Sequence, residues 1–286
     1  MIVPRTTRPE ILKRLKAKVA ARKPILISSA GSGLVASLHE KAGADCVNTF
    51  SGARLRANGM GTMAMMWPIL DSNQQVFDNT TQDILPAMKG DAFVCACINA
   101  NDPLRDMRSY LQKLLDAGIP SVSNIGPSVS YVDKDSTLYQ VLRNSGITFE
   151  NEIEMLQLAK EMGLVTIGLA FDIDDARAML ETAKPDIFCF HAGTTKGGLV
   201  GFDSGETIAV TAERSEQAYQ MARKIHPEVI LVGHGAAMET PEDAAYMLAN
   251  TSGDGIWTGS STERIPIEKA VFEATAAFAN LEFPDA

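Results

Sequence analysis

The sequence predicts a single closed barrel of eight parallel β-strands, each followed by a helix, with one further helix in front. Three observations favour this fold: eight short apolar runs rich in valine and isoleucine, helical patterns between them, and no low-complexity stretch or linker. Continuously apolar strands are typical of parallel sheets that are covered on both faces. Eight strand–helix units over about 240 residues match a (β/α)8 barrel. A doubly wound open sheet is the alternative.

The elements are expected in a regular order along the chain. A charged segment at about residues 8–23 predicts a leading helix, so we expect an N-terminal helical region at 1–23 and the barrel domain at 24–286. The eight strands are then expected at 24–30, 45–50, 92–99, 121–125, 165–170, 186–193, 229–235 and 255–261.

Helices between the strands are indicated by apolar residues at positions i, i+3, i+4 and i+7, as in Met107, Tyr110, Leu111 and Leu114. Similar stripes lie within 155–162, 176–183 and 218–225. The expected helix ends are N-caps at Asp102 and at Thr240 with Asp243, and C-terminal glycines at Gly43, Gly118 and Gly163.

Composition narrows the classes of function. The chain is 45% hydrophobic and 21% charged, which is ordinary globular usage. A formal charge of −9 disfavours binding to nucleic acid or to anionic membranes. No apolar run is long enough for a membrane span, the N-terminus has no signal-like apolar core, and the four cysteines lack zinc-finger spacing. We therefore expect a cytoplasmic protein with buried, reduced thiols.

Two connections are too long to be simple turns, Ser51–Asn73 and Gly126–Asp135. Both follow strands, so in a barrel both lie at the C-terminal face, where such loops cover or line the site. The methionines within Met60–Met66 favour an alternative for that part of the loop, a contact between subunits. A homo-oligomer is therefore expected.

Two of the four histidines, His191 and His234, end neighbouring predicted strands. A neutral imidazole there could move a proton, polarise a carbonyl or bind a metal. The alternative is a core histidine that hydrogen-bonds to the backbone. Two histidines at adjacent strand ends favour a catalytic role, whereas His39 and His226 are expected at the surface.

The eighth strand end offers the hydroxyl groups of Ser260 and Ser261, backbone N–H groups that enter a helix, and Arg264. Together with the turn at Gly235 it predicts a site for phosphate or carboxylate. The alternative is a serine N-cap followed by exposed charges.

The loop after the second strand contributes Arg54, which could bind a substrate carboxylate, and Asp71, which could take a proton or bind a cation. Solvated loop charges are the alternative. Further substrate contacts are expected from Gly33, Ser51, Asn99, Asp102, Asn124 and Lys196.

A divalent cation, Mg²⁺ or another, has candidate ligands in Asp102 and Asp172. No carboxylate or histidine motif has metal-ligand spacing, so a metal site would have to be assembled from separate strands. No nucleotide cofactor is expected.

An ordered set of motifs resembles the phosphoenolpyruvate hydrolase-like TIM-barrel family, also called TIM-barrel signal transduction proteins. The resemblance runs from about Pro24 to Phe278 and rests on five segments, which are Ser51–Gly61 with Asp71–Asn73, Asn101–Arg105, His191–Gly193 with Gly197-Gly198, Gly233–Gly235, and Gly259–Pro266. The family also occurs as the C-terminal half of a plant antiviral resistance protein.

The resemblance implies a barrel of the pyruvate kinase and isocitrate lyase type, whose members typically use Mg²⁺ to make or break C–C, C–P or P–O bonds in oxo-acids or enolpyruvate compounds. The chain departs from that pattern at Ala236-Ala237, Lys196 and Thr262, and it has no counterpart of the lysine–cysteine–glycine catalytic loop of isocitrate lyases.

These observations together predict an enzyme that hydrolyses or cleaves a small anionic oxo-acid or enolpyruvate-type substrate by histidine-assisted acid–base chemistry. Two alternatives stay open. One is a non-catalytic barrel that senses a metabolite or binds a partner. The other is a metal-dependent enzyme that cleaves C–C bonds in β-dicarbonyl compounds, with the histidines as ligands of a transition metal.

Overall fold

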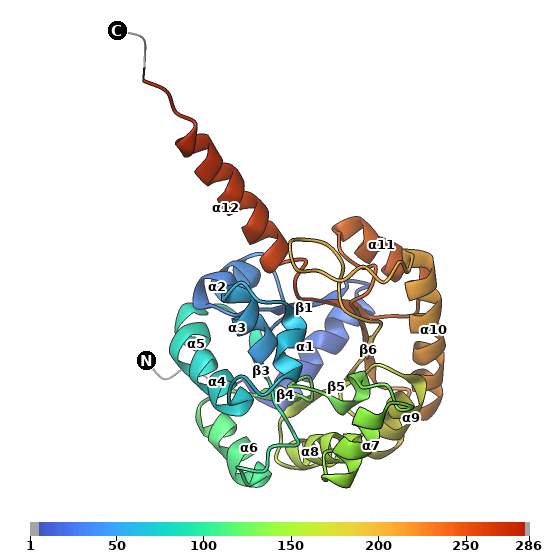
Figure 1. Ribbon diagram of the computed structural model, residues 1–286. Helices are drawn as coiled ribbons and strands as arrows, with labels where there is room; N and C mark the ends of the chain where they lie inside the picture. Colours follow the sequence, from blue (N-terminus) through green and yellow to red (C-terminus); the bar gives the residue numbers. More distant parts are fainter. Residues whose placement is uncertain (1–5, 284–286) are drawn as a thin grey trace.

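The protein forms a closed barrel of eight parallel strands in the order β1 to β8, with β8 paired to β1 (Figure 1). The computed structural model describes residues 6–283. The strands are Ile25–Ser29, Cys46–Thr49, Phe93–Cys97, Ser121–Ser123, Val165–Ala170, Ile187–His191, Ile230–His234 and Gly255–Thr258. All eight lie within the predicted runs, so the predicted barrel is confirmed and the open sheet is excluded.

Helices surround the barrel and alternate with the strands (Figure 1). They are α1 (Arg8–Ala20), α2 (Gly33–Lys41), α3 (Ser51–Ala57), α4 (Ser72–Asn79), α5 (Leu85–Ala87), α6 (Met107–Asp116), α7 (Thr137–Asn144), α8 (Phe149–Glu161), α9 (Ile173–Thr182), α10 (Ile208–Ile225), α11 (Pro241–Asn250) and α12 (Arg264–Ala279). Short 3₁₀ turns lie at Thr62–Met66 and Val129–Tyr131, and a π-helical turn at Thr80–Ile84.

The leading helix α1 belongs to the barrel core. Its Ile11 and Leu15 are fully buried and pack in one cluster with Ile25, Val165 and Ile187. These three residues stand at the beginnings of β1, β5 and β6, so α1 covers the N-terminal end of the barrel. The boundary expected between 1–23 and 24–286 stays a prediction, and residues 1–5 and 284–286 lie outside the described part of the chain.

The last helix departs from the predicted arrangement. Figure 1 shows α12 projecting away from the barrel instead of packing against its outer face. Arg264 is its one buried residue, whereas Val271, Phe272 and Phe278 have exposed fractions of 60%, 74% and 77%. The outer position after β8 is therefore left without its own helix.

Local details confirm some sequence expectations and correct others. Thr240 and Asp243 form a capping box at α11, and the glycines after α2, α6 and α8 have positive φ. The N-cap of α6 is Asp106, not Asp102, because the segment between them forms a separate turn in which Asp102 accepts from Leu104 N–H. The long connection after β2, expected as a loop, contains α3 and a 3₁₀ turn.

His39 is buried, and the expectation that it lies at the surface is wrong. The inner face of α2 packs on the barrel, and the Nε2 atom of His39 lies 3.1 Å from the carbonyl oxygen of Ser29. The four cysteines are free and buried. Within residues 6–283, no helix combines the length and the apolar character that crossing a membrane requires.

Candidate functional site

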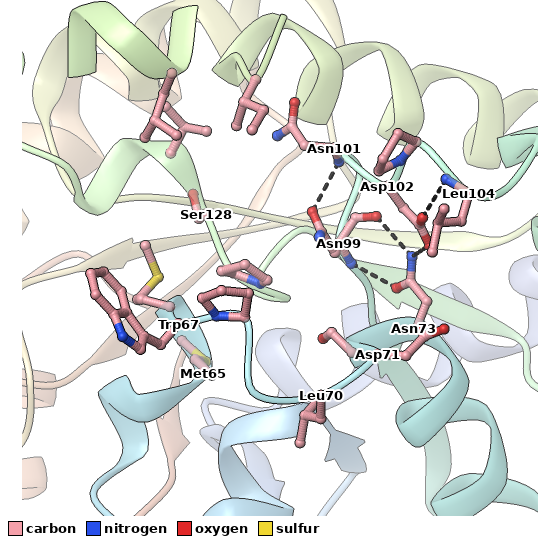
Figure 2. Close-up of a pocket in the computed structure, with 18 of the residues that line it drawn as sticks. Met65, Trp67, Leu70, Asp71, Asn73, Asn99, Asn101, Asp102, Leu104 and Ser128 are labelled. Carbon is pink, nitrogen blue, oxygen red and sulfur yellow. Dashed lines mark hydrogen bonds between the residues drawn. The ribbon is translucent and has the colours of Figure 1, made fainter. Parts of the chain in front are cut away.

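The candidate residues that the sequence placed in one cavity fall mainly into two cavities at the C-terminal end of the barrel. A central cavity of about 30 Å³ is bordered by His191, His234, Arg56 and Ser260. A side cavity of about 510 Å³ contains Asp71, Asn99 and Asp102 (Figure 2). The expected site residues are therefore divided between two places.

The two histidines of the central cavity are in direct contact. They end β6 and β7, and the pairing of these strands sets His191 beside His234 in register. Their ring centroids are 4.3 Å apart and the rings are perpendicular, at 89°. The structure thus places the two histidines together, as the sequence predicted.

Hydrogen bonds determine which nitrogen of each ring carries the proton. The Nδ1 atom of His234 lies 2.6 Å from the carbonyl oxygen of Trp257, which can only accept, so Nδ1 carries the proton and Nε2 keeps a lone pair. The Nδ1 atom of His191 accepts from Gly193 N–H at 3.2 Å, so its proton is on Nε2. The pair thus offers a hydrogen-bond acceptor at Nε2 of His234 and a hydrogen-bond donor at Nε2 of His191.

Burial keeps both rings neutral. It lowers the pKa of His234 to about 4, with a smaller lowering from the charge of Arg56. Burial also lowers the pKa of His191 well below its usual range, and the neighbouring His234 adds to this effect. A neutral His191 is also what the hydrogen bond accepted by its Nδ1 atom requires.

Aromatic side chains enclose the histidine pair. Phe171 stacks on His191 with ring centroids 4.3 Å apart, and Tyr131 meets Phe171 edge-on at 4.8 Å. On the opposite side, Trp257 lies 5.9 Å from His234. Sequence reasoning missed Phe171 and Tyr131, although an aromatic residue directly after a strand that ends at the barrel mouth was a usable signal.

Arg56, and not Arg54, reaches the central cavity. Its side chain is 2% exposed and donates from Nε and Nη2 to Glu263 and from Nη1 to Thr62. Arg54 lies on the outer side of α3, where it is 44% exposed and stands 4.0 Å from Asp83. The arginine that lines the central cavity is therefore two residues further along α3 than the one predicted.

Gly235 and Gly33 stand where a side chain would collide with neighbouring atoms. At Gly235, φ is +88° and a Cβ atom would stand 2.0 Å from the carbonyl oxygen of Gly193 and 3.0 Å from Nδ1 of His191. A Cβ atom at Gly33 would stand 2.4 Å from the carbonyl oxygen of Asp83. Gly235 thus allows the turn that supports the histidine, and Gly33 allows close contact of α2 with the chain before α5.

The eighth strand end only partly matches its predicted role. Ser260 lines the central cavity, whereas Ser261 does not. Arg264 donates to Glu268 and to the carbonyl oxygen of Gly197, so its guanidinium group is occupied away from the cavity. Lys196 borders a different surface hollow beside Asp243. The anion site expected around Arg264 is not assembled.

The acidic residues of the side cavity belong to a closed hydrogen-bond network. Arg105 donates to Asp102 and to Asp71, each at 2.6 Å, and Asn73 donates to Asp102 at 2.8 Å (Figure 2). Asp71 also caps α4, and the Arg105 guanidinium lowers the pKa of Asp71. Asn99 accepts from Asn101 N–H. These groups mainly hold the loops after β2 and β3 together.

Behind the site, a buried carboxyl group holds the end of β4. Glu152 of α8 accepts from Asn124, from the Ser128 hydroxyl and from Val129 N–H. Burial raises the pKa of Glu152 to about 8, against the opposing effect of these three hydrogen bonds. Asn124 is thus a structural residue, as is Ser51, which donates to the carbonyl oxygen of Gly126.

Comparisons with known proteins establish the family. Residues 10–281 match the sequence profile described as phosphoenolpyruvate hydrolase-like. The chain belongs to this family. It is 34% identical over 265 residues to the ToMV resistance protein Tm-1(GCR237) of Solanum lycopersicum, covering 92% of this chain and 34% of that protein. It is similar in the same way to the ToMV susceptible protein tm-1(GCR26) of the same plant, at 34% over 262 residues. The chain thus spans about a third of the length of these relatives.

Solved structures share the fold of this family member. A 2,3-dimethylmalate lyase of the PEP mutase/isocitrate lyase superfamily matches 99% of this chain and 91% of its own, with a TM-score of 0.60 and 14% identity. A phosphonopyruvate hydrolase in complex with oxalate and Mg²⁺ matches 96% of this chain and 87% of its own, with a TM-score of 0.58 and 16% identity. The likeness to these structures is one of fold, a closed barrel of eight parallel strands surrounded by helices.

The two carboxylates expected to bind a divalent cation are each engaged by other side chains. Asp102 is already paired with Arg105 and Asn73. Asp172 caps α9 and pairs with Lys134, away from Asp102. Across residues 6–283, no three histidine, cysteine, aspartate or glutamate residues are grouped to hold a metal ion. Mg²⁺ is commonly bound through one or two carboxylates together with water and substrate oxygens, and here the cationic side chains of Arg105 and Lys134 already occupy the two candidate carboxylates.

Proposed function

We propose that this protein is a hydrolase or lyase that acts on a 2-oxo acid or an enolpyruvate-type acid through the histidine pair at the barrel mouth. The observation that carries the proposal is the meeting of one free imidazole lone pair and one free imidazole N–H in an enclosed cavity. Perturbed groups in an enclosed cleft favour a functional site over a structural one. The lyases and hydrolases that share the fold support this reaction class.

The two rings would divide the acid–base work. The Nε2 atom of His234 accepts a proton from the substrate or from an attacking water molecule, and Nε2–H of His191 donates to the oxygen that gains charge. His191 keeps its proton throughout and acts only as a hydrogen-bond donor, and the pair returns to its resting state when Nε2 of His234 passes the proton it accepted to the leaving group or product.

Arg56 would orient the acid group of the substrate. Its Nη1 atom faces Thr62 at the cavity wall, while Nε and Nη2 are held by Glu263. A rigidly held guanidinium group fixes the direction of its remaining N–H, so the substrate loses less entropy on orientation. The hydroxyl groups of Thr194, Thr195 and Ser260 supply further donors around it.

Turnover of three acids tests the proposal. Phosphoenolpyruvate, oxaloacetate and phosphonopyruvate are offered to the protein, and pyruvate, oxalate and phosphate are measured as products. The His234→Ala variant should reduce turnover at least about 100-fold, the usual scale of general-base catalysis. His226→Ala, at the far end of α10, is the matched control and should change nothing. Full activity of His234→Ala would overturn the assignment.

The non-catalytic alternative is supported by the names of the relatives. Two are a viral resistance protein and its susceptible counterpart. A binding barrel would be stabilised by one of the three acids without consuming it, so the same measurements distinguish the two functions. A metal-dependent β-dicarbonyl cleavage would need ligands beyond the two histidines, and the described residues group none with them.

We also propose that the chain assembles with a second copy through α12 and acts in the cytoplasm. In a closed barrel the helix after β8 normally packs between those after β7 and β1, which here are α11 and α2. Both neighbours carry exposed apolar residues, namely Tyr246 on α11 and Leu34 and Leu38 on α2. The exposed apolar face of α12 from a second copy would cover them. Light scattering should find a dimer or larger assembly, which Phe272→Glu should dissociate.

A further inference from the structure

The side cavity has the size of a ligand site, whereas the central cavity does not. Ligand sites commonly measure about 300–1,000 Å³. The side cavity, at about 510 Å³, falls in this range, and the central cavity, at about 30 Å³, holds little more than a water molecule. The histidine pair can therefore contact only a small part of a substrate, and the rest must lie elsewhere.

The wall of the side cavity is chemically suited to hydrocarbon. Apolar side chains come from three loops, and Figure 2 shows Trp67, Leu70 and Leu104 around its opening. The charged groups there are already paired, since Arg105 holds both Asp71 and Asp102. Two carboxylates against one guanidinium leave the wall with a net negative charge. An apolar, uncharged group fits this wall, and a second acid group does not.

One residue lines both cavities. It is Met65, in the 3₁₀ turn after α3. Its side chain is 6% exposed and is therefore buried where the two cavities approach each other. Methionine is unbranched and has three rotatable side-chain bonds, so rotation of this residue can open a passage without movement of the backbone. The side cavity and the cavity of the histidine pair thus share a flexible side chain in their linings.

We propose that the side cavity is the binding site for an uncharged hydrocarbon chain of the substrate, whose 2-oxo acid head binds at the histidine pair, with Met65 displaced between them. The substrate class is a 2-oxo acid with a chain several carbons longer than that of pyruvate. This inference rests on the proposed function, because it takes the position of the acid head from it.

Binding of 2-oxo acids of increasing length tests the inference. Pyruvate, 2-oxopentanoate, 2-oxohexanoate and 2-oxooctanoate are titrated against the whole protein by calorimetry. Affinity should rise up to about fourfold for each methylene group that enters the cavity, from the usual transfer free energy of about 0.8 kcal/mol per CH₂. The dicarboxylate 2-oxoadipate should bind at least tenfold more weakly than 2-oxohexanoate, since its second acid group meets the negative wall.

Tryptophan emission gives an independent readout of position. Trp67 lies at the side cavity and is 70% exposed, whereas Trp257 is buried inside the barrel, and the chain has no third tryptophan. A hydrocarbon chain against Trp67 should shift its emission to shorter wavelength. Pyruvate should not produce this shift, and Trp67→Phe should abolish it for 2-oxooctanoate.

A pair of surface variants separates specific from general apolar binding. Leu104 borders the cavity and is 79% exposed, so Leu104→Asp adds a charge there without disturbing the core. It should remove most of the gain in affinity with chain length and leave pyruvate binding unchanged. Leu138→Asp, at a 52% exposed position on α7 outside the cavity, is the matched control and should keep the gain.

Each outcome decides the inference. The inference is supported if affinity rises with the chain length of the 2-oxo acid, if Leu104→Asp removes this rise, and if Leu138→Asp keeps it. Pyruvate binding without any gain for longer acids overturns it and leaves the proposed function intact. The inference is also overturned if the rise in affinity with chain length persists in both Leu104→Asp and Leu138→Asp. Failure of every 2-oxo acid to bind overturns the proposed function, and this inference with it.

Discussion

Replacement of Glu263 by glutamine tests whether a buried ion pair supports the mouth of the barrel. Arg56 donates to Glu263 from Nε and Nη2, and Gly31 N–H donates to the same carboxylate at 2.5 Å. The two charged side chains are 2% and 5% exposed, so solvent screens them little. Removal of one partner of a buried pair costs about 3–5 kcal/mol, because the other charge stays buried without compensation. That is a large share of a typical unfolding free energy of about 5–15 kcal/mol.

Urea unfolding followed by tryptophan fluorescence measures the loss. The double variant Arg56→Met with Glu263→Gln removes both charges and should recover most of the stability. Glu228→Gln is the matched control, since Glu228 and its partner Lys16 are 76% and 52% exposed, and the loss of such a pair should cost under about 1 kcal/mol. The reasoning is refuted if Glu263→Gln costs no more than this control, or if the double variant is as unstable as the single one.

Three further predictions concern pH, the buried glutamate and metal binding. The pKa of His234 is about 4 in the folded chain and near 6.5 when unfolded, so the unfolded chain takes up a proton first. The contribution of His234 to stability should fall by about 3 kcal/mol as the pH drops from 6.5 to 4 and level off below, so urea titrations of His234→Gln should show a smaller fall over this range than those of the unmodified chain. Glu152→Ala leaves three buried donors without an acceptor and should cost at least about 2 kcal/mol in urea unfolding, whereas the exposed Glu154→Ala should cost almost nothing. Millimolar Mg²⁺ should leave the midpoint of thermal unfolding unchanged, and a clear rise would contradict the absence of a grouped ligand set among the described residues.

The parts of this site that follow from strand order could be predicted from the sequence. Strand ends of a parallel barrel meet at one face, so two histidines at neighbouring ends had to lie close together, as His191 and His234 do. The network of Asp71, Asn73 and Asp102 was partly predictable for the same reason, since all three follow neighbouring strands.

Features that depend on helix rotation could not be read in the same way. Arg54 and Arg56 are two residues apart, so in α3 they point in different directions. Because the sequence predicted a loop there, it gave no basis for deciding which of the two arginines faces the barrel mouth. For Arg264, the glutamate four residues later was a signal of an ion pair within the helix. Glu152 shares a helical face with Phe149 and Ile153, and that position in an apolar stripe could have revealed its burial.

The central claim is that the barrel mouth holds two neutral histidines in opposite tautomers. Nitrogen-15 NMR of the imidazole rings at pH 7 tests it most directly, with His191→Gln and His234→Gln used to assign the signals. The structure predicts a proton on Nδ1 of His234 and on Nε2 of His191, with both rings uncharged. Identical tautomers, or an imidazolium ion at either position, would contradict the claim.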